Sequence, residues 1–247
     1  METKNYYSKD YMAKYTNQSR SLESREKKSL AIIRKICMHA EGKFCDIGCG
    51  DGFFLGSVAE ALMSNWSYYG GEYSDFQRER AAQNKRLVIE KIDLEKGLHY
   101  SDGFFDVAYS GEVIEHLYDP DMMVTEICRV LKSGGYFILT TPNMNSWLSR
   151  LLFPLGMQPI NYECSTVSST YGYSWLKRFK RQDWPVGHVR LFNIHSLKDI
   201  LQANGFEIIS IKGATFEFIP NRLRWLDNFF ALMPSFASGL VVLARKI

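Results

Sequence analysis

Apolar residues along this chain fall into two alternating patterns. Short, continuous apolar runs are typical of strands buried on both faces of a sheet, and stretches with apolar residues every three or four positions are typical of helices. The predicted strands are 44–47, 66–71, 88–94, 105–110, 136–141, 206–211 and 240–244. The predicted helices are 28–39, 54–62, 121–131 and 196–204. This alternation predicts an α/β fold, with a mostly parallel sheet that has helices on both faces.

The alternation is interrupted after Pro142 and Asn143. Residues from about 144 to 187 are rich in aromatic residues, Ser and Thr, and they contain three prolines. A stretch of this length between sheet elements is typically a lid or a binding segment, so we expect a substrate-recognition insertion. Residues from about 1 to 30 are polar and bear several tyrosines, and we expect them to cap a single domain that spans 1–247.

Composition narrows the class of protein only a little. The 247 residues are 46% apolar and 23% charged, which is ordinary for a globular chain with a sizeable core. A net charge of +3 is too small to indicate nucleic acid or membrane binding by itself. The N-terminus lacks an apolar signal segment and no apolar run reaches spanning length, so we expect a cytoplasmic protein. None of the five cysteines forms a Cys-x-x-Cys pair, and we expect reduced, packed thiols.

A glycine-rich loop follows the first predicted strand. Asp46 ends that strand, and Gly48, Gly50 and Gly52 then alternate before a helix-type apolar pattern begins. Glycine tolerates positive φ and carries no side chain that could clash, so this loop suits backbone pressed against a bound molecule. The spacing differs from the Gly-x-Gly-x-x-Gly that cradles a pyrophosphate.

Polar residues end three later strands in the same way. Glu72 follows the second strand about 20 residues past the loop, where an acid can accept hydrogen bonds from ribose hydroxyls. Asp93 closes the third strand, and Ser110 ends the fourth. This order of motifs across about 45–143 resembles the class I S-adenosylmethionine-dependent methyltransferases, with another α/β nucleotide-binding domain as the alternative.

The resemblance implies a fold and a cofactor site. The fold is a Rossmann-like, seven-stranded, mostly parallel sheet with an antiparallel C-terminal strand, and the cofactor is S-adenosylmethionine. Its implied contacts are Asp46, Gly48, Gly50 and Gly52 on the methionine part, Glu72 on the ribose, Asp93 and the Leu94 backbone on the adenine, and Ser110 or Gly111 behind the sulfonium. The alternatives are a surface acid at Glu72 and a turn cap at Asp93.

Two histidines are candidate catalytic bases. His116 follows the fourth strand, and His188 follows the insertion. An imidazole titrates near neutral pH and can take a proton from an acceptor, although a lone histidine more often hydrogen-bonds a turn. With Glu112 and Glu115, the two histidines also suit a divalent metal such as Mg²⁺, because Glu-x-x-Glu places two carboxylates about one turn apart. The set resembles that of metal-dependent O-methyltransferases acting on quinone-precursor phenols or on RNA ribose.

Two further segments bear on partners. Residues 175–184 interleave basic and aromatic side chains, which suits a polyanion such as RNA, the anionic head of a lipid-linked sugar, or a solvated helix face. Residues 216–236 carry an apolar stripe with arginines, which suits peripheral contact with a membrane surface, a homodimer partner, or coverage of the core.

The function expected from all these features is O-methylation of a hydroxyl on a small molecule, a sugar or a lipid-linked saccharide. The alternatives are a metal-dependent RNA ribose 2'-O-methyltransferase and a non-catalytic S-adenosylmethionine-binding partner protein. Superfamily membership does not identify the acceptor.

Overall fold

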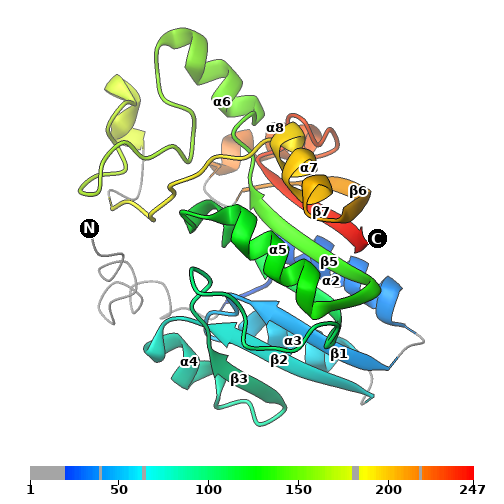
Figure 1. Cartoon of the computed structure of the whole chain (residues 1–247). Helices are drawn as coiled ribbons and strands as arrows, with labels where there is room; N and C mark the ends of the chain where they lie inside the picture. Colours follow the sequence, from blue (N-terminus) through cyan, green and yellow to red (C-terminus); the bar gives the residue numbers. More distant parts are fainter. Residues whose placement is uncertain (1–19, 39–40, 63–64, 180–183, 217–218) are drawn as a thin grey trace.

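The computed structural model contains one seven-stranded sheet with helices on both faces (Figure 1). It describes residues 20–38, 41–62, 65–179, 184–216 and 219–247. The strands are β1 (Gly42–Ile47), β2 (Trp66–Glu72), β3 (Leu87–Lys91), β4 (Phe105–Gly111), β5 (Leu131–Pro142), β6 (Phe206–Ala214) and β7 (Gly239–Lys246). The helices are α2 (Ser24–Cys37), α3 (Phe53–Ala61), α4 (Asp75–Ala81), α5 (Pro120–Val130), α6 (Trp147–Leu152), α7 (Ile194–Ala203) and α8 (Arg224–Phe230).

The strand order is β3-β2-β1-β4-β5-β7-β6. Neighbours among the first five strands pair in parallel, whereas β7 runs antiparallel to both β5 and β6. The fold expected from the sequence is therefore confirmed. The order reverses direction between β1 and β4, and in open α/β sheets such a switch point places a ligand site at the carboxyl ends of the strands.

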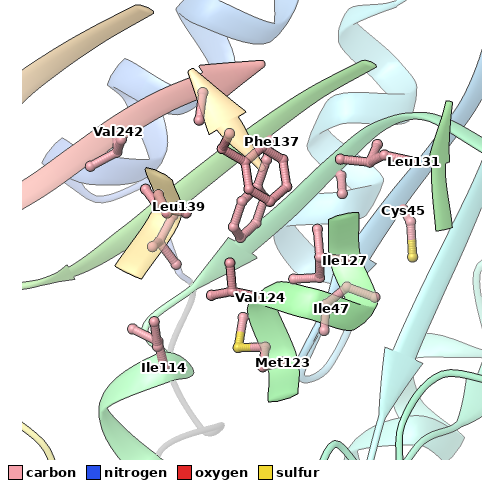
Figure 2. Close-up of a cluster of buried hydrophobic side chains, with 14 of the residues drawn as sticks. Cys45, Ile47, Ile114, Met123, Val124, Ile127, Leu131, Phe137, Leu139 and Val242 are labelled. Carbon is pink, nitrogen blue, oxygen red and sulfur yellow. The ribbon is translucent and has the colours of Figure 1, made fainter. Parts of the chain in front are cut away.

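Side chains alternate between two cores along the central strands. In β5, Phe137 and Leu139 belong to a cluster that also holds buried residues of α5 and α7, whereas Ile138 belongs to a cluster with residues of α2 and α3. Figure 2 shows the first cluster, where Met123, Val124 and Ile127 of α5 lie against the sheet. Burial on both faces explains why these strands are continuous apolar runs in the sequence.

The fifth strand begins earlier than predicted. Residues 132–135 separate the predicted helix 121–131 from the predicted strand 136–141, but they lie within β5. The pairing with β4 is irregular there: Leu131 lies opposite Phe105, and the next pair is Tyr136 with Val107. Gly134 has a φ of 75°, so the glycines allow the strand to bulge rather than to end.

The insertion adds α6, two short 3₁₀ segments at Phe153–Leu155 and Ser174–Phe179, and extended chain that leads from β5 to α7. Figure 1 shows α6 extending away from the sheet. The described part of the chain includes only residues 20–30 of the N-terminal cap expected over 1–30. It includes all of the insertion except residues 180–183. Within the described residues, no helix has the length and apolar character that crossing a membrane requires.

Candidate functional site

The glycine-rich loop turns sharply between β1 and α3. Gly48 and Cys49 both donate backbone N–H hydrogen bonds to the Gly71 carbonyl on β2, at 2.8 and 3.0 Å. Gly52 then serves as the N-cap of α3 with a φ of 76°. The loop is therefore held at the carboxyl ends of β1 and β2, beside the switch point of the sheet.

Gly48 and Gly50 serve different purposes in this loop. Both have positive φ, at 81° and 54°, which a side chain would strain. A Cβ atom on Gly48 would lie 2.4 Å from Val113 Cγ2, whereas a Cβ on Gly50 would meet no atom within 4 Å. Gly48 is thus required by packing, and Gly50 presents bare backbone to open space, as the approach of a cofactor demands.

Glu72 organises this loop from the end of β2. Its buried carboxylate accepts hydrogen bonds from Gly50 N at 2.9 Å and Ser74 N at 2.7 Å. Burial raises the pKa of Glu72, and these backbone N–H groups oppose that shift. Each carboxylate oxygen has a second lone pair, so Glu72 also fits the predicted ribose contact. The expected alternative of a solvated surface acid is wrong, because the side chain is buried.

Asp46 is the most isolated acid of the site. It is 2% exposed, and within the described part of the chain no donor hydrogen-bonds to its carboxylate. Burial raises its pKa well above the ordinary value, and Glu26 and Glu72 raise it further. A carboxyl so placed beside the glycine loop fits the amino group of a bound methionine moiety, which would supply the missing donor.

Asp93 and Ser110 make local contacts as well. The Asp93 carboxylate accepts from Glu95 N at 3.2 Å and pairs with Lys96 at 2.8 Å, as in the turn-cap alternative. Its contact with adenine, together with that of the half-buried Leu94, stays a prediction. Ser110 is fully buried, and its hydroxyl donates to the Ile47 carbonyl at 2.9 Å, so it links β4 to β1 where the cofactor is expected.

The two candidate bases lie together although 72 positions separate them in the sequence. His116 ends a short 3₁₀ helix (Ile114–His116) after β4, and its ring centroid lies 4.9 Å from that of His188. His116 Nδ1 lies 3.1 Å from the Gly187 carbonyl, and His188 Nδ1 lies 3.0 Å from the Asn161 carbonyl. Since a carbonyl only accepts, each Nδ1 carries the proton and each Nε2 holds the lone pair.

Glu115 completes this group. The side chain is 2% exposed; its Oε2 accepts from Thr141 Oγ1 at 3.0 Å, while Oε1 is buried without a hydrogen-bond partner among the described residues. Burial, followed by the charge of Glu112, raises its pKa well above the ordinary value, and burial lowers the pKa of His116. One ligand atom each from Glu115, His116 and His188 lie within 4.8 Å of one another.

Glu112 stays outside this group. It lies at the end of β4 with a φ of 57°, and the 3₁₀ helix begins only at Ile114, so Glu112 and Glu115 do not share a turn as expected. Its carboxylate accepts from Thr140 Oγ1 at 3.1 Å and lies 3.7 Å from Arg25. Two imidazoles and one carboxylate fit a transition ion such as Zn²⁺ better than the expected Mg²⁺, which prefers oxygen ligands.

Sequence reasoning missed one cation beside the loop. Arg20 pairs with Glu26, lies 3.7 Å from Asp51 and sits 5.1 Å above the Phe53 ring. A guanidinium in this position fits the carboxylate of the expected cofactor. No pattern in the polar N-terminal residues distinguishes Arg20, because its place beside the loop comes from the tertiary contacts with Asp51 and Phe53.

The fold and this site define the class I S-adenosylmethionine-dependent methyltransferases. A family model described as a methyltransferase domain matches residues 18–211, so the chain belongs to that family. A probable S-adenosylmethionine-dependent methyltransferase of Mycolicibacterium smegmatis is 27% identical over 169 residues, which cover 66% of this chain and 51% of the relative. The mitochondrial ubiquinone biosynthesis O-methyltransferase of Homo sapiens is 23% identical over 215 residues, covering 80% and 52%.

Solved structures support the same fold. A SAM-dependent methyltransferase from Aquifex aeolicus has a TM-score of 0.61 at 14% identity, covering 96% of this chain and 98% of that one. A Haemonchus contortus phosphoethanolamine N-methyltransferase in complex with S-adenosyl-L-methionine has a TM-score of 0.59 at 18% identity, covering 89% and 52%. The chain spans about half the length of the two curated relatives described above.

Proposed function

We propose that this chain transfers the methyl group of S-adenosylmethionine to a hydroxyl oxygen on a small molecule, a sugar or a lipid-linked saccharide. The observation that carries the proposal is the grouping of Glu115, His116 and His188, close to the carboxyl end of β4 and so at the same edge of the sheet as the glycine loop. A hydroxyl group must lose its proton as its oxygen attacks the methyl group, so a nearby base assists the transfer. The sulfur of a thioether carries no proton and needs no such base. Relatives named ubiquinone biosynthesis O-methyltransferases support oxygen as the acceptor atom.

The cofactor supplies a methyl group on a positively charged sulfur, so the protein mainly has to position the acceptor, exclude water and accept a proton. The Nε2 atoms of His116 and His188 are the candidate bases, because both Nδ1 atoms donate their protons to carbonyls. Burial lowers the pKa of His116, which keeps its ring neutral and ready to accept a proton at neutral pH.

The second candidate is a metal-assisted version of the same transfer, with RNA ribose as one acceptor. It is favoured by the buried, unpaired Glu115 Oε1 beside two imidazoles that donate their Nδ1 protons to carbonyls, as metal-bound histidines usually do. A divalent ion held there would lower the pKa of an acceptor hydroxyl. Trp175, Lys177 and Arg178 of the expected RNA-binding run lie on the described surface, whereas residues 180–183 lie outside the described residues.

Partner contacts of the 216–236 segment remain proposals. Leu226 and Phe230 of α8 pack against a buried cluster that contains Trp147, so part of the expected stripe covers a small core. Trp225, Phe229 and Leu232 are exposed beside Arg222 and Arg224 and are available to a membrane surface or a second copy.

The test is transfer of label from S-adenosylmethionine to a catechol, a hexose glycoside and a short RNA, with and without chelator. His116→Ala or His188→Ala should lower the rate about 100- to 10,000-fold, as expected for loss of a general base. The exposed histidine variant His195→Ala is the matched control and should keep the wild-type rate.

Each outcome of this test has a meaning. Transfer to the catechol or glycoside in excess chelator supports the metal-free hydroxyl proposal. Transfer that chelator abolishes and Zn²⁺ restores supports the metal-assisted candidate. Transfer to RNA alone overturns the first choice of acceptor, and cofactor binding without transfer to any acceptor favours a non-catalytic partner protein.

A further inference from the structure

Glu163 in the insertion binds three consecutive backbone N–H groups. Its Oε1 accepts from Val186 N at 2.8 Å, and its Oε2 accepts from Gly187 N at 2.8 Å and from His188 N at 3.2 Å. Hydrogen bonds to an ionised carboxylate are roughly twice as strong as neutral ones. One side chain therefore fixes the place where the insertion returns to the fold.

The segment that Glu163 fixes also orients both candidate bases. The Gly187 carbonyl accepts from His116 Nδ1, and His188 is itself a member of the segment. On the other side, the Asn161 carbonyl accepts from His188 Nδ1 at 3.0 Å. Asn161 and Gly187 both have positive φ, at 73° and 89°. Residues 161–163 and 186–188 thus form a clamp that sets the direction of two imidazole rings.

The clamp is tied to the catalytic edge of the sheet by a third contact. Val189 N and Arg190 N both donate to the Glu115 carbonyl, at 2.9 and 3.0 Å. The chain directly after the clamp is therefore anchored to the 3₁₀ helix that carries Glu115 and His116. Glu163 is the only carboxylate in the described residues that binds N–H groups of 186–188, so its loss would loosen the clamp while residues 189 and 190 stay anchored to this helix.

We propose that Glu163 is a positioning residue that holds His116 and His188 in the Nδ1–H tautomer, in which the lone pair of each ring lies on Nε2. This inference rests on the proposed function, which gives the two imidazoles their role as bases. It assigns the insertion a second task beside acceptor recognition: formation of the catalytic group depends on the insertion being folded onto 186–188.

The tautomers are tested directly by long-range ¹H–¹⁵N spectra of the histidine rings in the full chain. The wild-type protein should show the Nδ1–H pattern for both residues. In Glu163→Ala, His188 should shift toward a mixture of tautomers, and the rate of methyl transfer to the best acceptor should fall at least about 10-fold. The Kd for S-adenosylmethionine, measured by calorimetry, should stay within about twofold, because the clamp does not touch the glycine loop.

Glu163→Gln should lie between the wild-type protein and Glu163→Ala, because one of its two acceptor oxygens is retained. Glu207→Gln is the matched control: this exposed glutamate lies near the start of β6, which runs parallel to β5 and so begins at the opposite edge of the sheet. Its histidine spectrum and rate should be those of the wild-type protein.

Wild-type histidine signals in Glu163→Ala would overturn the inference. If circular dichroism shows that Glu163→Ala does not fold, the same histidine signals are measured in Glu163→Gln, which keeps the size of the side chain. Altered histidine tautomers in Glu163→Gln support the positioning role, and unaltered tautomers contradict it. The histidine spectra are recorded without an acceptor, so they test this inference separately from the proposed function. The proposed function fails if the wild-type protein transfers no methyl group to any acceptor, and this inference fails if the histidine signals do not change.

Discussion

Glu72, Asp46 and Glu115 are three buried acids near the carboxyl ends of β2, β1 and β4, and their surroundings set what each can do. Glu72 is engaged by backbone N–H groups on both oxygens, whereas Asp46 and one oxygen of Glu115 have no donor in the described part of the chain. Buried carboxyls without partners are costly and are typical of functional sites. The acids with unmet hydrogen-bonding capacity are therefore those expected to meet cofactor or acceptor.

Replacement of Glu72 should weaken cofactor binding. In Glu72→Gln, the amide NH₂ would face the N–H group of either Gly50 or Ser74. Because both groups are donors, that hydrogen bond would be lost and the loop would shift. We expect the Kd for S-adenosylmethionine to rise at least about 10-fold, which corresponds to about 1.4 kcal/mol. Calorimetric titration measures this change, with the exposed α4 variant Glu79→Gln as control. Equal Kd values in both variants would contradict the role of Glu72.

At the scale of elements, the insertion and the C-terminal excursion are joined through one buried carboxylate. Asp227 of α8 is fully buried and accepts from Trp147 Nε1 on α6 at 2.8 Å and from Phe216 N at 2.9 Å, as well as from the Ser238 hydroxyl. Trp147 and Phe230 stack beside it, with ring centroids 5.5 Å apart. This junction holds α6 and α8 against the start of β7.

Loss of the Asp227 charge should destabilise that junction. Asp227→Asn keeps the shape but turns one acceptor into a donor, which leaves at least one buried partner unsatisfied. We expect the free energy of unfolding to fall by about 1–3 kcal/mol. Urea unfolding followed by tryptophan fluorescence measures it, and the exposed neighbour variant Asn228→Ala should change little. An unchanged unfolding midpoint in Asp227→Asn would show that the hydrogen bonds contribute nothing net.

A second junction, between α5 and the chain before β4, depends on pH. The Glu126 carboxylate pairs with Arg129 at 2.8 Å and accepts from Leu98 N at 2.8 Å. The hydrogen bond from Arg129 is the main cause that lowers the pKa of Glu126 from 4.5 to about 2. A folded pKa below the unfolded one contributes stability that is present above pH 4.5 and is lost as the pH falls toward about 2.

Glu126→Gln should therefore be less stable than the wild-type protein at pH 7, and the difference should shrink as the pH falls through this window. Urea unfolding measures the effect at about pH 7, which lies above this window, and at about pH 4 and about pH 3, which lie inside it. The exposed variant Glu207→Gln should show no such convergence. A constant difference between Glu126→Gln and the wild-type protein at all three pH values would contradict the assigned shift.

At the scale of the whole molecule, one sheet connects two hydrophobic cores to a single ligand edge. The cores lie on opposite faces of the sheet, and the glycine loop and the Glu115, His116 and His188 group both lie where its parallel strands end. A cofactor bound at this edge, as proposed, would contact chain segments from both halves of the sheet. The cofactor should therefore stabilise the fold as a unit.

S-adenosylmethionine at about 100 times its Kd should stabilise the folded state by about 2.7 kcal/mol. For a chain of this size the midpoint of thermal unfolding should rise by roughly 5–10 °C. A thermal shift assay measures it, and Glu72→Gln at the same cofactor concentration should show a smaller rise. An equal rise with ATP would indicate a general nucleotide-binding domain instead.

The arrangement of strands, the glycine loop and the acid of β2 could all be predicted from the sequence. These features depend on residues that are close together in the sequence. The alternation of apolar runs determines the strands of the sheet, and Gly48, Gly50 and Gly52 allow a loop with positive φ. The bulge at Gly134 was less predictable, because the pairing of β5 with β4 decided it.

The grouping of Glu115, His116 and His188, which is the proposed catalytic group, was decided by the tertiary structure. Spacing alone suggested that Glu112 and Glu115 act together, but the backbone at Glu112 directs it toward Thr140 and Arg25. Conversely, no spacing marks Glu163, whose partners are more than twenty residues away in the sequence. The sequence determined which strands form and where a cofactor binds, since both follow from local pattern. Only the packing of the insertion against the edge of the sheet brought Glu115, His116 and His188 together, because those contacts join distant parts of the chain.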